Sequence, residues 1–129
     1  KVEVKTTLDL KDKKILLVDD NALNIKVATK ILERFNANNI TSLDSGFACL
    51  ELIESGKKFD IILLDDMMPK VTGSETLQIL REIPGFNTRV VVLTANAITG
   101  SKEKYIEIGF DDYLSKPIDK KELRESILK

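Results

Sequence analysis

The sequence contains no histidine and only one cysteine, Cys49. Without histidine, the chain cannot form the Ser-His or Cys-His pairs of many nucleophilic enzymes, a histidine-ligated metal site or a phosphohistidine of its own. A single cysteine cannot form an internal disulfide, which favours a reduced, intracellular setting. Apolar runs never exceed four residues, so no segment of this chain is long enough for a transmembrane helix or a signal peptide.

An excess of charge of one sign is also absent. The net charge is −1 and the isoelectric point is about 5.6, so neither nucleic acid nor an anionic membrane is expected as a partner of the whole surface. With 129 residues, 43% of them hydrophobic and 32% charged, the chain has the size and composition of one globular domain with its own core.

Short apolar runs alternate with amphipathic stretches of helical length. The expected strands are KILLV (14–18), NITSL (39–43), DIILL (60–64), RVVVL (89–93) and DYLS (112–115), and the expected helices are 21–35, 45–56, 72–83, 99–108 and one that opens at Asp119. This alternation predicts an α/β fold with a parallel sheet, right-handed crossovers and helices on both faces. The mixed, charged residues 1–12 are expected to be a linker or entry segment ahead of a single domain, 13–129.

The first expected helix carries two apolar patterns. We expect its core-facing stripe to consist of Leu23, Val27, Ala28, Ile31 and Phe35. Ala22, Ile25 and Thr29 fall outside this stripe and are expected to form a second, small patch on the surface.

Polar residues follow the apolar strands. Asp19 and Asp20 come after the first strand and Asp65 and Asp66 after the third, while Thr94 ends the fourth and the fifth leads into Lys116. Ligands of such sheets bind beyond the carboxyl ends of the strands. If the first and third strands are neighbours, three carboxylates converge, and each pair about 4 Å apart costs roughly 4 kcal/mol at an effective dielectric of 20. A divalent cation with oxygen ligands relieves this repulsion, and Mg²⁺ is the natural choice beside a phosphate.

Asp65 and Asp66 are adjacent, so their side chains point to opposite faces of a strand and only one can enter such a pocket. The alternation alone leaves open which one does. A metal-free flavin or dinucleotide site is disfavoured, because the turn DDNALN after the first strand lacks the Gly, Ser or Thr residues that cradle a phosphate.

Four motifs, ILLVDDN, DIILLDDMMP, VVVLTAN and DDYLSKPI, resemble those of the receiver domain of two-component response regulators, in the same order. The resemblance extends from about Lys13 to the end of the chain. It implies a flavodoxin-like, doubly wound (βα)5 fold with strand order 2-1-3-4-5.

The resemblance also assigns the acids. The phosphoacceptor lies four residues before the proline of the third motif, which gives Asp65 and leaves Asp66 as a solvated or helix-facing carboxylate. Asp19, Asp20 and Asp65 are implied to bind Mg²⁺, with Mn²⁺ as an alternative, together with the main-chain carbonyl of Met67.

Further roles follow from the same resemblance. Thr94 and Lys116 are implied to contact the phosphoryl group, and the Lys116-Pro117 peptide bond is expected to be cis. Thr94 and Tyr113 are the expected switch residues, and the output surface spans the fourth helix, fifth strand and fifth helix, including Lys104 and Tyr105.

The implied partner is a phosphohistidine-bearing kinase or phosphotransfer domain, expected to dock on Ala22, Ile25 and Thr29. The chain most resembles the receiver of a hybrid sensor histidine kinase, on the residues of the motifs LTAN and YLSKPI and the linker-like residues 1–12. Such a receiver is expected in the cytoplasm or in the cytoplasmic part of a membrane-bound chain. The domain would then be a switch that undergoes phosphorylation and dephosphorylation, within a chain that can include the kinase. No direct contact with nucleic acid or membrane is expected of this segment.

Three alternatives remain. One is the receiver of a stand-alone or DNA-binding response regulator. A second is a Mg²⁺-dependent phosphohydrolase with an aspartate nucleophile, which is disfavoured because such enzymes tend to carry Asp-x-Asp, whereas Asp19 and Asp20 are adjacent. The third, an unphosphorylated protein-binding domain of the same fold, is disfavoured because every site residue is present.

Overall fold

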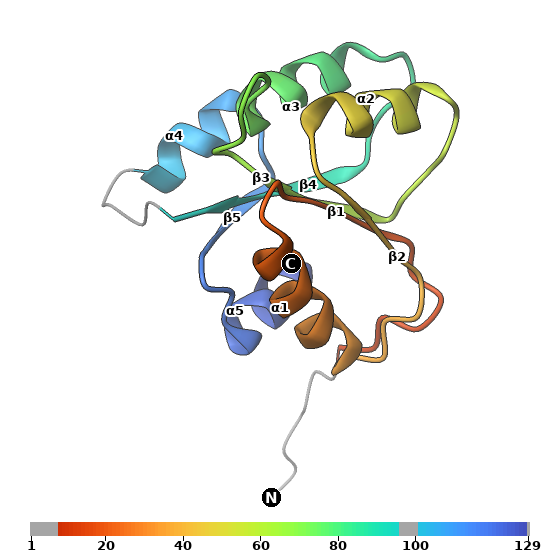
Figure 1. Ribbon diagram of the computed structural model, residues 1–129, viewed down its shortest axis with the longest axis vertical. Helices are drawn as coiled ribbons and strands as arrows, with labels where there is room; N and C mark the ends of the chain where they lie inside the picture. The colour runs from red at the N-terminus through yellow and green to blue at the C-terminus, as the bar shows by residue number, and fades with distance from the viewer. Residues whose placement is uncertain (1–7, 96–100, 129) are drawn as a thin grey trace, which may run out of the picture.

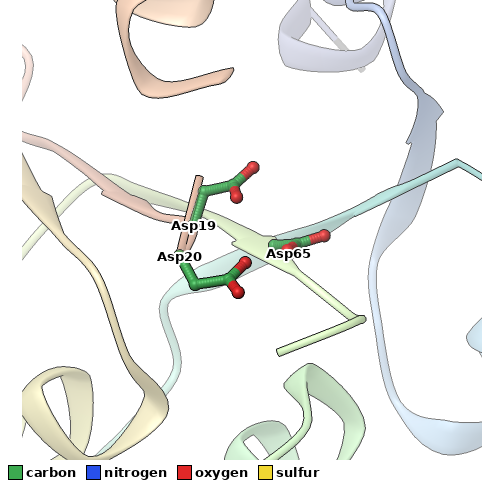
Figure 2. Close-up of side chains that lie close together, drawn as sticks. All are labelled: Asp19, Asp20 and Asp65. Carbon is green, nitrogen blue, oxygen red and sulfur yellow. The ribbon is translucent and has the colours of Figure 1, made fainter. Parts of the chain in front are cut away.

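The computed structural model describes residues 8–95 and 101–128, which form a three-layered α/β domain (Figure 1). Its sheet has five parallel strands in the order β2-β1-β3-β4-β5. The strands are β1 (Ile15–Val18), β2 (Ile40–Leu43), β3 (Ile61–Asp65), β4 (Arg89–Thr94) and β5 (Asp112–Ser115). The predicted strand order is therefore confirmed. Because β1 lies beside β3, the acids at the ends of these two strands meet at one edge of the sheet (Figure 2).

Helices cover both faces of the sheet. They are α1 (Ala22–Glu33), α2 (Gly46–Glu54), α3 (Gly73–Glu82), α4 (Ser101–Ile108) and α5 (Lys120–Leu128). The α1 and α5 helices cover one face, and α2, α3 and α4 cover the other (Figure 1). Each predicted helix is present with its ends shifted by at most a few residues, although residues 99 and 100 of the expected fourth helix lie outside the described residues.

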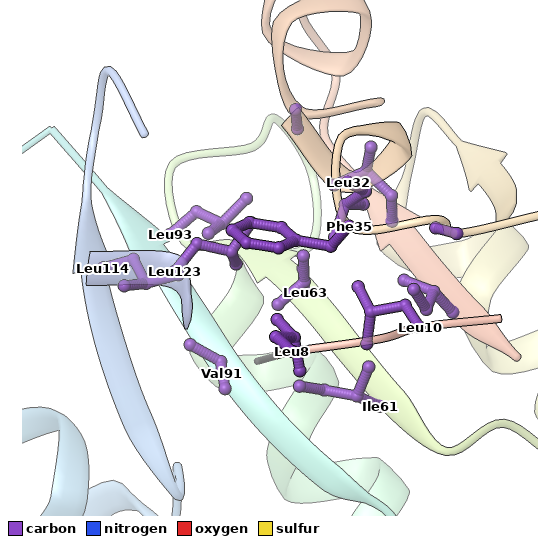
Figure 3. Packing of buried hydrophobic residues seen from close by; sticks show 14 residues of the cluster. Leu8, Leu10, Leu32, Phe35, Ile61, Leu63, Val91, Leu93, Leu114 and Leu123 are labelled. Carbon is purple, nitrogen blue, oxygen red and sulfur yellow. The ribbon is translucent and has the colours of Figure 1, made fainter. Parts of the chain in front are cut away.

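Two hydrophobic clusters hold these layers together, one on each face of the sheet. Alternate side chains of the central strands enter opposite clusters: Ile61 and Leu63 of β3 pack beneath α1 and α5, whereas Ile62 and Leu64 pack beneath α2 to α4. Figure 3 shows the first cluster, where Phe35 lies among leucines from the sheet and the helices. Burial on both faces explains why the strands are continuously apolar.

The helix ends follow local chemistry in the sequence. The side chain of Asn21 accepts hydrogen bonds from the backbone N–H groups of Leu23 and Asn24 at the start of α1. At the start of α3, Thr72 and Glu75 form a reciprocal capping box. None of the helices among the described residues is long and apolar enough to cross a membrane.

Part of the stretch 1–12, which was expected to be a linker or entry segment, packs on the domain. Leu8 and Leu10 are buried, with exposed fractions of 7% and 3%, and pack in the cluster beneath α1 and α5. The backbone N–H of Leu10 also donates to the carbonyl of Phe35 at 2.7 Å. The alternation of leucines with charged residues is the pattern of a half-buried extended segment, and it was hidden by the high charge of the stretch.

The predicted core stripe of α1 is also partly wrong. Leu23 and Val27 are exposed, at 67% and 38%, whereas Ile25 packs against the cluster beneath α1 and α5. The expected surface patch of Ala22, Ile25 and Thr29 therefore does not exist as such, since Ile25 faces the core. Two stripes of α1 satisfy the helical spacing, and the rotation of the helix on the sheet decides between them.

Candidate functional site

Three carboxylates gather at the carboxyl edge of the sheet (Figure 2). Asp19 follows β1 and Asp65 ends β3; each is only 1% exposed, whereas the neighbouring Asp20 is exposed. One carboxylate oxygen from each residue lies within 4.8 Å of the other two. The register that pairs Val18 with Leu64 accounts for this convergence, because it places the next residue of each strand side by side.

Lys116 brings a positive charge to the cluster from the loop after β5. Its Nζ lies 2.8 Å from Asp65 Oδ1 and 3.5 Å from Asp19 Oδ2. Its backbone N–H donates to the carbonyl of Thr94, and the bond to Pro117 is cis, as expected. The lysine thus reaches across β4 from the edge strand to the third strand.

The charges shift the proton equilibria of the site. Burial raises the pKa of Asp65 to about 6; Lys116 opposes this, while Asp19 and Asp20 add to it. Burial lowers the pKa of the Lys116 ammonium, but its contacts with Asp65 and Asp19 outweigh this and leave the pKa raised. One ammonium does not balance three carboxylates, so the cluster retains excess negative charge.

This donor set fits a hard divalent cation. Three carboxylates offer oxygen ligands within reach of one centre, and their excess negative charge favours a cation over any anion at that point. Asp20 is open to solvent, which gives an ion a route of entry. Carboxylates are ligands that Mg²⁺ and Mn²⁺ prefer. The structure brings together the three acids that were predicted to bind metal.

The turn between β3 and α3 closes tightly over the end of β3. A Cβ atom on Gly73 would lie 2.3 Å from the backbone oxygen of Asp65, so glycine is required there. The backbone N–H groups of Met68 and Gly73 both donate to the carbonyl of Asp66. Met67, which was predicted to offer its main-chain carbonyl to the metal, lies in this turn, and its side chain is 72% exposed.

Asp66 faces away from the acid cluster, in agreement with the strand alternation. Its Oδ1 accepts from the backbone N–H and the hydroxyl of Ser74, at 3.1 and 2.9 Å. Its Oδ2 accepts from the hydroxyl of Tyr105 in α4 at 2.8 Å. The predicted helix-facing orientation of Asp66 is thus confirmed, with partners from α3 and α4.

Tyr105 was predicted to lie on the output surface, but the structure buries it. It is 8% exposed, it packs edge-on against Phe110 with ring centroids 5.7 Å apart, and its hydroxyl lies 3.2 Å from Thr94 Oγ1. The sequence signal for this burial is the spacing of Tyr105, Ile108 and Phe110 around the end of α4, which is short and easily missed. Lys104 is exposed, as expected.

The expected switch residues lie at the ends of the last two strands. Thr94 is fully buried at the end of β4, directly opposite Ser115 of β5. Tyr113 of β5 is half-buried on the cluster beneath α2 to α4, and the ammonium of Lys102 lies 5.9 Å from the centre of its ring. Tyr113 therefore lies on the α4-β5 surface, next to Lys102 of α4.

Fold and site together define a doubly wound α/β domain with a cluster of three acids and a lysine at the carboxyl edge of its sheet. The chain belongs to the response regulator receiver domain family, whose pattern matches residues 15–128. The resemblance found in the four sequence motifs is thereby confirmed.

Known proteins with similar sequences include sensor kinases. The chain is 33% identical over 131 residues to the sensor histidine kinase GacS of Pseudomonas protegens, and 34% identical over 116 residues to the signal transduction histidine-protein kinase BarA of Escherichia coli. These matches cover 98% and 89% of this chain but only 14% and 12% of the two kinases. The chain therefore spans a small part of the length of these relatives.

Solved receiver domains have the same fold. The receiver domain of the histidine kinase CKI1 from Arabidopsis thaliana, complexed with Mg²⁺ and BeF3⁻, is 28% identical, with a TM-score of 0.77 over 93% of both chains. The receiver domain of a Francisella response regulator is 34% identical, with a TM-score of 0.71 over 91% of this chain and 95% of that one. The flavodoxin-like fold with strand order 2-1-3-4-5 is thus confirmed.

Proposed function

We propose that this receiver domain accepts a phosphoryl group on Asp65 from a phosphohistidine of its partner. The observation that carries the proposal is the buried carboxylate of Asp65, 2.8 Å from the ammonium of Lys116 and within a cluster of three acids. In this arrangement the Asp65 carboxylate lies between a cation bound by the acids and the ammonium of Lys116. These two positive charges would offset the repulsion between the carboxylate and the incoming phosphoryl anion, so the carboxylate is suited to attack the phosphorus atom.

The reaction is a phosphoryl transfer. An oxygen of the Asp65 carboxylate forms a bond to phosphorus while the P–N bond to the imidazole breaks. The electron pair of that bond stays on the imidazole nitrogen, which leaves as neutral histidine after it takes up a proton. The product is an acyl phosphate on Asp65, and attack by water or return to a histidine resets the domain.

Asp19, Asp20, Asp65 and the main-chain carbonyl of Met67 would hold Mg²⁺, with Mn²⁺ as an alternative. When bound, the cation neutralises charge on the oxygens of the transferred group. The CKI1 receiver domain, which was crystallised with Mg²⁺ and BeF3⁻, supports this assignment by homology. Lys116 and Thr94 complete the contacts, the lysine through its charge and the threonine through its hydroxyl.

Phosphorylation is proposed to change the α4-β5-α5 surface. The phosphoryl group adds nearly two negative charges and new acceptor oxygens at Asp65. Thr94 turns its hydroxyl toward this group, and Tyr113 repacks in response, so the surface around Lys102 and Lys104 carries the signal.

The partner is proposed to dock on the exposed apolar side of α1. Leu23 and Val27 line a shallow cavity of about 150 Å³ that also includes Lys116 and Pro117, directly beside Asp19. A helical domain that carries the donor histidine can cover this apolar edge while its phosphohistidine reaches Asp65. Ile25, which faces the core, has no part in this contact.

The full-length protein is proposed to be a hybrid sensor histidine kinase, on the basis of similarity to GacS and BarA. Its receiver would then work in the cytoplasm, or on the cytoplasmic side of a membrane-bound chain. A receiver from a stand-alone or DNA-binding response regulator is the alternative within the family.

Incubation with Mg²⁺ and a small acyl phosphate tests the proposal. Intact mass should show one phosphoryl group per chain, and none without a divalent cation. Stoichiometric labelling without release of phosphate from a phosphate ester supports a receiver, whereas repeated turnover of such an ester supports the phosphohydrolase alternative. An unlabelled wild-type chain would contradict the proposal.

A further inference from the structure

Asp66, the residue after the proposed phosphoacceptor, is bonded through its side chain to two helices. Its Oδ1 accepts from the backbone N–H and the hydroxyl of Ser74 at the start of α3, at 3.1 and 2.9 Å. Its Oδ2 accepts from the hydroxyl of Tyr105 in α4 at 2.8 Å. Hydrogen bonds to an ionised carboxylate are stronger than those between neutral groups. We call Ser74, Asp66 and Tyr105 the Asp66 clasp.

The backbone of Asp66 fixes both ends of the turn between β3 and α3. Its N–H donates to the carbonyl of Leu93 in β4 at 3.1 Å, and its carbonyl accepts from the N–H groups of Met68 and Gly73 at 3.1 and 2.9 Å. The turn therefore starts and closes on one residue, whose side chain is held by α3 and α4. Met67, which is proposed to offer its main-chain carbonyl to the cation, lies inside this turn.

A metal ligand in a turn binds well only when the turn already has the conformation that presents it. The apparent dissociation constant equals the intrinsic one divided by the fraction of molecules in the competent conformation. A loose turn would have to lose its conformational freedom when the cation binds. Hydrogen bonds that fix the turn in advance therefore tighten the binding of the cation.

We propose that the Asp66 clasp positions the cation site: Asp66 faces away from the acid cluster and binds no cation itself, but its bonds to Ser74 and Tyr105 hold the turn that carries Met67. Because one of these bonds comes from α4, the position of α4 and the affinity for the cation are coupled, and each affects the other by the same factor. This inference rests on the proposed function, since it concerns the cation that the phosphoryl transfer uses.

The test is calorimetric titration of the 129-residue chain with Mn²⁺ and with Mg²⁺. Tyr105→Phe and Ser74→Ala each remove one hydroxyl that donates to Asp66, and neither changes a charge. Each should raise the Kd for Mn²⁺ about threefold to tenfold, which is the range of one hydrogen bond. Tyr105→Phe also removes the 3.2 Å contact of that hydroxyl with Thr94 Oγ1, whereas Ser74→Ala leaves it intact, so a loss in both variants points to Asp66.

A matched control and a stability measurement separate positioning from general support. Ser55→Ala removes a hydroxyl that donates to the carbonyl of Leu52 at the end of α2, and it should bind Mn²⁺ as wild type does. A clasp with a purely structural role would lower the Tm but leave the affinity of the folded chain unchanged. An unchanged Kd in both Tyr105→Phe and Ser74→Ala, measured well below the Tm, would therefore overturn the proposal.

Hydrogen exchange tests the coupling to α4. In wild type, Mg²⁺ should slow amide exchange in α4, because the cation fixes the turn to which Tyr105 is bonded. Tyr105→Phe should abolish this effect, whereas Ser74→Ala should retain it, since the bond from α4 to Asp66 remains. Equal protection of α4 by Mg²⁺ in Tyr105→Phe and in wild type would contradict the coupling.

Failure of the clasp is distinguishable from failure of the proposed function. If wild type binds Mn²⁺ and is labelled by a small acyl phosphate, and both variants match its affinity, the clasp is wrong and the function stands. If wild type binds no divalent cation and takes up no phosphoryl group, the proposed function is wrong and the clasp with it.

Discussion

Lys116 Nζ lies 2.8 Å from Asp65 Oδ1, although the two residues are 51 positions apart in the chain. Asp65 ends β3 and Lys116 follows β5, with β4 between these strands, so it is the parallel sheet that brings the two residues together. Because Asp65 is 1% exposed, the contact places a nucleophile and a counter-charge in a protected site.

Loss of the lysine charge should slow phosphorylation. Lys116→Ala removes the ammonium that offsets negative charge on the transferred group, and the removal of one such donor typically costs about a hundredfold in rate. The measurement is the rate of labelling by a small acyl phosphate with Mg²⁺. Lys121→Ala, an exposed lysine on α5, is the control and should label at the wild-type rate; equal rates for both variants would show that the ion pair is not used.

Divalent cations should stabilise the domain against heat. At a Mg²⁺ concentration tenfold above the dissociation constant, the gain is roughly 1.4 kcal/mol, seen as a rise in Tm. Asp20→Asn should lose most of this gain without unfolding, because Asp20 is exposed. Asp44→Asn removes an exposed acid after β2 and should keep the gain. A Mg²⁺ effect that survives in Asp20→Asn would place the metal elsewhere.

Without metal, stability should depend on the charge of Asp65. Burial raises the pKa of this carboxyl from 3.8 to about 6, so between these values the folded domain binds more protons than the unfolded chain. Stability therefore falls as pH rises through this window. Asp65→Asn, which keeps the group neutral, should be more stable at pH 8 by on the order of 1–3 kcal/mol, with no such gain below about pH 4.

Denaturant unfolding of wild type and Asp65→Asn, in the presence of a chelator, measures this difference. A matched series with Asp44→Asn, an exposed carboxylate after β2, controls for charge. A variant that is equally stable or less stable at pH 8 would mean that Lys116 outweighs burial and the repulsion from Asp19 and Asp20.

Transfer from a protein donor should depend on the apolar edge of α1. Leu23→Glu changes a side chain that is 67% exposed, so the fold should survive while transfer from a phosphohistidine domain slows by about tenfold or more. Labelling by a small acyl phosphate should stay unchanged, because that donor needs no docking. Ile79→Glu on α3, also exposed, is the control. Equal transfer to Leu23→Glu and wild type would exclude this docking site.

Much of the fold could be predicted because its signals are local. Continuous apolar runs mark strands buried on both faces, and the Thr72–Glu75 pair marks a helix start. The opposite orientations of Asp65 and Asp66 also follow from strand alternation. Counting from Pro69, by resemblance to the family, then selects Asp65 as the acid of the pocket, and the placement of Asp65 beside Lys116 agrees with that choice.

The rest depended on how elements pack, which local pattern does not encode. Leu23 and Ile25 both fit a helical stripe, and only the rotation of α1 on the sheet buries Ile25. Leu8 and Leu10 are core residues within a charged stretch. The contact of Tyr105 with Asp66 joins residues 39 positions apart and requires the placement of α4 against β4 and α3.

The most direct measurement of the central claim is the position of the acyl phosphate. After labelling with Mg²⁺ and a small acyl phosphate, borohydride reduces a phosphorylated aspartate to homoserine, which peptide mass mapping locates. We predict homoserine at position 65 in wild type and in Asp66→Asn, and no labelling in Asp65→Asn. Homoserine at position 66, or undiminished labelling of Asp65→Asn, would contradict the account.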